Sequence, residues 1–216
     1  MPFADWRITA LHQALYTFNT NGRELVQLLI ILSDGEVFLE LQRDESREAL
    51  EAAHAEVVRL LHNYLASAFS LVDHARRVIE DEGLASESLL PAYRERIRRE
   101  YAEDPMHRFL QGLRAYTLHL NAPVSVAELR AVRTAPDGPL DSSCGFQLDL
   151  RSLRSWPNWD KPAREFLAAA GQTINLLELV RKYNSRIKTL YSWFFLRLRE
   201  DGLKRAGIDP GSLVVP

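Results

Sequence analysis

Residues 46–82 read SREALEAAHAEVVRLLHNYLASAFSLVDHARRVIEDE, and this stretch decides the fold. Its apolar residues recur at steps of three and four for about ten turns at 3.6 residues per turn, as on the buried face of an amphipathic helix. They are Leu50, Ala53, Val57, Leu60, Tyr64, Leu71, Ala75 and Val78. Ser46 is the expected N-cap, and the helix is expected to end at Glu80-Asp81-Glu82-Gly83. An apolar stripe this long needs other long helices to cover it.

Two further segments carry similar stripes. The first runs from Asp5 to Leu32, is interrupted by Asn19-Thr20-Asn21-Gly22, and is predicted to kink or split there. The second is a very long helix from its cap Asp160 to Gly202, with Gly171 as a candidate bend. Each stripe supplies a partner surface for the helix over residues 46–82.

A shorter helix is predicted to begin at Ser86 and to restart at Asp104-Pro105, because proline suits the first turn of a helix. Together these segments predict a mainly α fold, an antiparallel four- or five-helix bundle. We expect one domain over residues 1–216. The run from Glu36 to Arg43 fits either a strand or a helix, and residues 203–216 are expected to form a loose C-terminal tail.

A short β-hairpin is predicted within residues 124–155, before the last long helix. Residues 124–134 are rich in β-branched side chains, residues 137–139 form a turn signal, and Phe146, Leu148 and Leu150 alternate with polar residues. The following turn, residues 156–162, carries two tryptophans that are expected to act as an aromatic plug.

The composition favours a protein of the cytoplasm. The chain has 27 Lys and Arg against 29 Asp and Glu, so its net charge of −2 does not indicate a polyanionic partner. A single cysteine, Cys144, cannot form an internal disulfide, which fits a reducing compartment. The N-terminus does not resemble a secretory signal, and no apolar run approaches the roughly 20 residues of a membrane-spanning helix. We therefore expect no membrane association.

The one hint of chemistry lies in residues 109–123, FLQGLRAYTLHLNAP, where Arg114 and His119 stand in a largely apolar helical segment. A guanidinium is permanently charged and shaped to hold phosphate oxygens, and a neutral imidazole can accept a proton from a hydroxyl and return one to a leaving oxygen. Together they could support cleavage of an RNA phosphodiester without a metal ion, with the ribose 2′-hydroxyl as the attacking group.

The motif Arg114-Ala-Tyr-Thr-Leu-His119, near the end of a helix in an all-helical chain, resembles the Arg-x(4 to 6)-His motif of the HEPN superfamily. The resemblance covers roughly residues 46–123, with the last helix completing the bundle. It implies a metal-independent ribonuclease, or an RNA-binding relative, of a bacterial defence or toxin–antitoxin system. It also implies a homodimer in which the two motifs face each other, with Arg114 and His119 as the catalytic residues and no cofactor.

Asp73, Arg77 and Tyr116 are the predicted substrate-binding residues, because in a bundle they could face Arg114 and His119. Two simpler alternatives remain open. Asp73 and Arg77 are four residues apart and suit an ordinary surface ion pair, and Asp73 is also a candidate partner for Arg114. Five residues on an unbroken helix advance the direction by about 140°. Arg114 and His119 therefore converge only at a helix end or distortion near Asn121, or across two subunits.

Other patterns carry less weight. Glu51-x-x-His54 has a spacing found in di-iron bundles, but only residues 104–107 come near to a second such motif, so no metal site is predicted. The basic residues of the last helix could follow a nucleic-acid backbone, with two tyrosines nearby for stacking. These residues are Arg181, Lys182, Arg186, Lys188, Tyr183 and Tyr191. The alternative function is a non-enzymatic helical module that dimerises or binds a protein partner through an apolar stripe and the tryptophan-rich turn.

Overall fold

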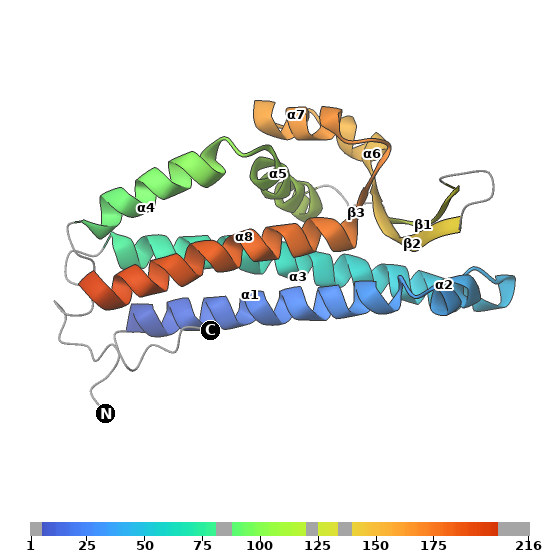
Figure 1. Ribbon diagram of the computed structural model, residues 1–216, viewed down its shortest axis with the longest axis horizontal. Helices are drawn as coiled ribbons and strands as arrows, with labels where there is room; N and C mark the ends of the chain where they lie inside the picture. The colour runs from blue at the N-terminus through green and yellow to red at the C-terminus, as the bar shows by residue number, and fades with distance from the viewer. Residues whose placement is uncertain (1–5, 81–87, 120–124, 134–139, 203–216) are drawn as a thin grey trace.

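Three long helices form the body of the protein in the computed structural model, which describes residues 6–80, 88–119, 125–133 and 140–202. They are α1 (Trp6–Ile31), α3 (Arg47–Ile79) and α8 (Leu176–Arg197). Helix α1 runs antiparallel to α3 and α8 (Figure 1). The stripe in residues 46–82 lies at the centre of this bundle, since Val57, Leu60, Tyr64 and Leu71 are all buried. The prediction of a mainly α fold with a short hairpin is confirmed.

Helix α1 is continuous through residues 19–22, so the predicted kink or split there is wrong. Packing explains why the polar run stays helical. Asn21 Nδ2 donates to the Asn63 carbonyl across the α1–α3 contact at 3.2 Å, and Gly22 is buried beside Tyr64 and Asn184. Tertiary contacts therefore outweigh the weak local helix propensity of this run.

The segment that fitted either a strand or a helix is helix α2 (Gly35–Leu41), capped by Asp34, whose Oδ1 accepts from the backbone nitrogens of Glu36 and Val37. A 3-10 turn, η1 (Asp44–Ser46), leads into α3. Ser46 occupies the N-cap position of α3 as predicted, but its side chain makes no capping hydrogen bond.

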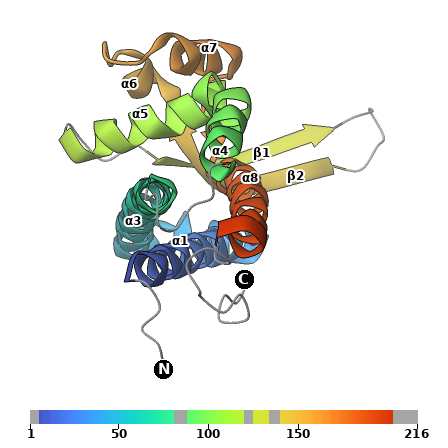
Figure 2. The ribbon, with the colours of Figure 1, turned by 90° about the vertical axis from the view of Figure 1, so that its left-hand side faces the viewer.

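Helix α4 (Leu89–Ile97), a π-helical turn η2 (Arg98–Ala102) and α5 (Pro105–His119) lie over α3 and α8 (Figure 2). The predicted restart at Asp104-Pro105 is confirmed. Pro105 is the first residue of α5, and Asp104 Oδ1 accepts from the His107 backbone nitrogen at 2.8 Å.

The hairpin consists of β1 (Ser125–Arg133) and β2 (Leu140–Asp149), and the short helix α6 (Leu150–Arg154) follows it. A third strand, β3 (Thr173–Asn175), pairs antiparallel with β2, with Ile174 opposite Leu148. The sequence analysis did not predict this strand.

Strand β3 divides the segment predicted as one helix from Asp160 to Gly202, so that prediction is wrong. Asp160 caps only the short helix α7 (Lys161–Ala169), and Asn175 caps α8 through Oδ1, which accepts from the Glu178 nitrogen at 2.9 Å. Helix α7 ends at Ala169, two residues before Gly171, where only a bend was predicted. A last π-helical turn, η3 (Leu198–Gly202), ends the described chain, and the predicted tail over residues 203–216 lies outside the described residues.

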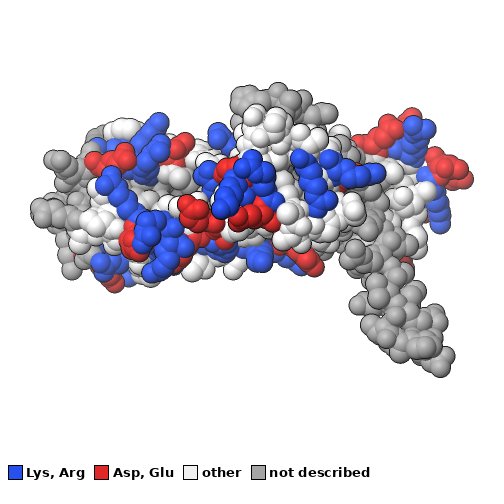
Figure 3. Space-filling view, turned by 90° about the horizontal axis from the view of Figure 1, so that it is seen from above, with Lys and Arg blue, Asp and Glu red and all other residues white. Residues whose placement is uncertain are grey.

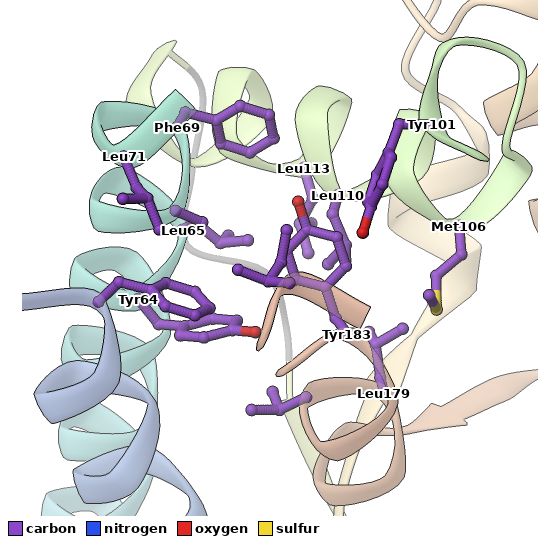
Figure 4. Close-up of a cluster of buried hydrophobic side chains, with 14 of the residues drawn as sticks. Tyr64, Leu65, Phe69, Leu71, Tyr101, Met106, Leu110, Leu113, Leu179 and Tyr183 are labelled. Atoms are coloured by element: carbon purple, nitrogen blue, oxygen red, sulfur yellow. The ribbon is translucent and has the colours of Figure 1, made fainter. Parts of the chain in front are cut away.

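One hydrophobic cluster joins the helices and β2. Figure 4 shows its centre, where Tyr64, Leu65 and Phe69 of α3 meet Leu110 and Leu113 of α5 and Tyr183 of α8. The 156–162 turn enters the same cluster. Trp159 is buried, stacks on Phe109 with centroids 5.3 Å apart, and donates from Nε1 to the Leu153 carbonyl.

The surface seen from above mixes both signs of charge (Figure 3), which matches a solvated face better than a continuous basic platform. Among the helices that the structure describes, none has both the length and the apolar character that crossing a membrane requires.

Candidate functional site

Arg114 lies in the third turn of α5 and is half-buried. Its guanidinium carbon is 5.5 Å from the centroid of the Phe69 ring of α3, a cation–π arrangement. Its Nε is buried and has no hydrogen-bond partner. A buried donor without a partner costs about 1–3 kcal/mol, and more on a charged group. A phosphate oxygen is the kind of acceptor that would satisfy this nitrogen, provided that a rotation of the side chain brings the buried Nε to the surface.

His119 is the last residue of α5, and its side chain lies outside the described residues. The helix is unbroken from Arg114 to His119, so the two Cα–Cβ directions differ by about 140° and the rise between them is about 7.5 Å. Helix α5 ends only at His119, so no helix end or distortion lies between the arginine and the histidine. In a single chain the backbone of α5 therefore does not bring positions 114 and 119 to one face of the helix.

Among the described residues, no hydrogen bond or ion pair joins the predicted substrate-binding residues Asp73, Arg77 and Tyr116 into one cluster with Arg114. Asp73 is exposed and pairs with Arg76 at 3.0 Å, not with Arg77 or Arg114. Arg77 is exposed on the same turn. Tyr116 is buried, and its ring packs edge-on against Trp156 with centroids 5.7 Å apart, so it has no free face for a substrate.

His107 is the residue near Arg114 that the sequence analysis missed as part of this site. It precedes Arg114 by seven residues, about two turns, which places both on one face of α5. Its ring centroid is 5.8 Å from that of Phe69, the same ring that Arg114 covers. Its Nδ1 is hydrogen-bonded to the Tyr183 hydroxyl at 3.0 Å. The seven-residue spacing was the available signal, but it does not distinguish a site from a core contact.

Burial governs the ionisation of this cluster. Desolvation lowers the pKa of His107 to about 4, against a raising effect from Asp104, so the imidazole is neutral at pH 7. Desolvation also raises the pKa of Tyr183 well above its ordinary value, so its hydroxyl stays protonated. The His107–Tyr183 pair is therefore a neutral, aromatic-lined support for α5.

This burial predicts acid sensitivity. Between pH 6.5 and about 4 the unfolded chain protonates His107 while the folded chain does not, so stability is full above pH 6.5 and falls as the pH drops to about 4. The loss is at most about 3.4 kcal/mol, because the pKa falls from 6.5 to about 4 and each pKa unit corresponds to about 1.36 kcal/mol. Urea unfolding at several pH values checks this, and a His107→Gln variant should lose less stability over that range. Parallel curves for the two proteins would contradict the prediction.

Beside this cluster, Arg186 of α8 is fully engaged. It pairs with Asp104 at 2.8 Å, donates to the Glu100 carbonyl, and lies 5.1 Å from the Tyr101 ring centroid. The adjoining cavity of about 450 Å³ is lined by more acidic than basic side chains. Tyr183 and Tyr191 are buried. Nucleic-acid binding by Arg186 with stacking on these two tyrosines, which the sequence left as a possibility, therefore has no support from their contacts.

In the Glu51-x-x-His54 pattern, Glu51 forms a surface ion pair and His54 packs against an aromatic ring. Glu51 accepts from Arg47 at 3.1 Å, and the His54 ring lies 6.4 Å from that of Phe146. Within the described ranges, no group of three or more His, Cys, Asp or Glu side chains is arranged to hold a metal ion.

Comparisons with known proteins leave the candidate site without a relative. No protein-family model matches the chain, and no match was found among curated proteins or solved structures.

Proposed function

We propose that this chain is a HEPN-like protein that binds RNA through Arg114 and cleaves it without a metal ion. One observation carries the proposal: the buried, unpartnered Nε of Arg114, on a helix that ends at His119. The bundle supports it, because α3 holds Arg114 against Phe69 and limits where the guanidinium can go. The motif resemblance supplies the reaction class.

The reaction would be an internal transfer of the phosphodiester. The ribose 2′-hydroxyl attacks the neighbouring phosphorus while His119 accepts its proton. The bond from phosphorus to the 5′-oxygen breaks, and protonation of that oxygen completes the exchange. Arg114 would bind the non-bridging oxygens and stabilise the charge that develops on them. The products are a 2′,3′-cyclic phosphate and a 5′-hydroxyl.

The divergence of Arg114 and His119 favours a homodimer as the active form. If one copy contributed the arginine and the other the histidine, the angle between them on α5 would not matter. A defence or toxin–antitoxin role follows from the resemblance and belongs to this proposal.

Incubation of the full chain with total RNA in excess EDTA tests the function. We expect cleavage by the wild type and a loss of about 10²–10³-fold in Arg114→Met, which keeps the apolar stem over Phe69 but removes the charge. Arg94→Met, at an exposed position on α4, is the matched control and should cleave as the wild type does. Equal cleavage by Arg114→Met and wild type would refute a role for Arg114.

A second candidate function, a non-enzymatic interaction module, is favoured by a different observation. Ile30 and Ile31 at the end of α1 and Leu39 on α2 are 45%, 56% and 59% exposed. The tryptophan-rich turn does not extend this surface, because Trp159 is buried and Trp156 packs on Tyr116. If the chain is an interaction module, the double variant Ile31→Ser with Leu39→Ser would abolish self-association measured by light scattering. Neither the wild type nor any variant would then cleave RNA.

A further inference from the structure

A groove between α1 and α8 has features that the α5 site does not explain. It encloses about 420 Å³, within the range of small-molecule sites. Its walls come from two helices only. They are Asn19, Gly22, Arg23 and Val26 of α1 and Arg181, Asn184, Ser185 and Lys188 of α8. All three charged lining residues are cations.

These three cations have no carboxylate partner among the described residues, and unlike Arg77, Arg94 and Lys182, which also have none, they lie together in one groove. Several other arginines are held by carboxylates, as in Arg59–Glu56, Arg98–Glu95 and Arg108–Asp160. By contrast, Arg23, Arg181 and Lys188 form no ion pair or hydrogen bond with any residue that the structure describes. Like charges gathered without counter-charges repel one another, and a bound anion would relieve that repulsion.

The polar part of the groove is positioned by the core. The buried Tyr64 hydroxyl donates to Asn184 Oδ1 at 2.9 Å, which fixes the amide and leaves its Nδ2 as a donor. Gly22 makes room for this amide, since a Cβ there would lie 3.1 Å from both Asn184 side-chain heteroatoms. The groove therefore offers a fixed amide donor in addition to the cations.

Asn19 adds a different requirement, because its side-chain oxygen needs a hydrogen-bond donor and not an anion. Its Oδ1 is buried and has no hydrogen-bond partner. A carbonyl oxygen accepts and does not donate, so a phosphate oxygen cannot satisfy it. A ligand that met both features would carry an anion for the cations and, once the Asn19 amide turns toward the groove, a hydroxyl or N–H donor for its Oδ1.

We propose that the α1–α8 groove binds a nucleoside phosphate, with the phosphate on Arg23, Arg181 and Lys188 and a ribose hydroxyl donating to Asn19. None of the lining residues belongs to α5, so this inference stands apart from RNA cleavage. The same chemistry is present in a free nucleotide and in a residue of an RNA chain. The choice between these two sources is left to the test.

The test measures binding by the full chain of AMP, by calorimetry, and of a labelled RNA of about eight nucleotides, by fluorescence anisotropy. The RNA arm uses the His119→Ala background, so that cleavage does not interfere. Arg181→Gln with Lys188→Gln should weaken binding by about tenfold or more for each charge removed. Arg94→Gln, at an exposed position on α4 outside the groove, is the matched control and should bind as the unchanged chain does. Unchanged thermal unfolding confirms that the variants fold.

Loss of AMP binding in the groove variants would identify a free nucleotide as the ligand. Loss of RNA binding, with no AMP binding by the wild type, would identify an RNA chain. In either case the 2′-deoxy form of the ligand should bind more weakly, and equal affinity would overturn the role given to Asn19. The proposal fails if the wild type binds neither ligand, or if the double variant binds as tightly as Arg94→Gln. The AMP arm remains informative even if the chain cleaves no RNA.

Discussion

Replacing His119 with alanine is expected to slow RNA cleavage by about 10²–10⁴-fold, the usual contribution of a positioned general acid or base. The imidazole at the end of α5 is the group assigned to take the proton of the 2′-hydroxyl and to supply one to the leaving oxygen. Initial rates on a defined RNA oligonucleotide in EDTA measure the effect.

His74→Ala is the matched control for that experiment, because His74 is a half-buried histidine on α3 with no role in the proposed reaction. It should cleave at the wild-type rate. If His119→Ala and His74→Ala both cleave as the wild type does, His119 is not the general base and the assignment of the motif falls.

Replacing Gly112 with alanine is expected to destabilise the protein by about 1–3 kcal/mol, although Gly112 lies within α5 and alanine is the better helix former by about 1 kcal/mol. The reason is Trp159. A Cβ at position 112 would lie 2.4 and 2.6 Å from two atoms of its ring. The ring cannot move freely, since it stacks on Phe109 and donates to the Leu153 carbonyl. Urea unfolding at pH 7 measures the change.

Gly35→Ala provides the comparison. Gly35 begins α2, and a Cβ there would meet nothing within 4 Å, so helix propensity alone should act and the variant should be as stable as the wild type or slightly more so. If Gly112→Ala raised the stability as much as Gly35→Ala, the Trp159 contact could not be as close as described.

The sequence predicted what depends on long apolar periodicity. The stripe from Leu50 to Val78 became α3, and the Pro105 restart and the hairpin were also found where expected. It failed where tertiary contacts override local signals. Residues 19–22 suggested a break, but Asn21 donates to the Asn63 carbonyl and the run stays in α1. The segment after Asp160 suggested one helix, but α7 ends at Ala169 and β3 then pairs with β2.

The candidate site was predicted only in part, for a related reason. A motif on one helix gives the order of Arg114 and His119, but not what faces them. The Phe69 ring that meets both Arg114 and His107 comes from packing between α3 and α5, and Tyr116 packs against Trp156. Helix spacing left Arg77 and Arg114 as alternative partners for Asp73, yet its partner is Arg76. The periodicity of a sequence does not show which of several nearby arginines an aspartate will pair with.

The end groups of the cleaved RNA test the central claim most directly. A labelled RNA oligonucleotide and the same sequence with a single 2′-deoxy residue are incubated with the wild type in EDTA, and the products are analysed by mass spectrometry. The account predicts a 2′,3′-cyclic phosphate with a 5′-hydroxyl, and no cleavage after the deoxy residue. Intact RNA, a 5′-phosphate product, or cleavage after the deoxy residue would contradict attack by the 2′-hydroxyl at an Arg114–His119 site.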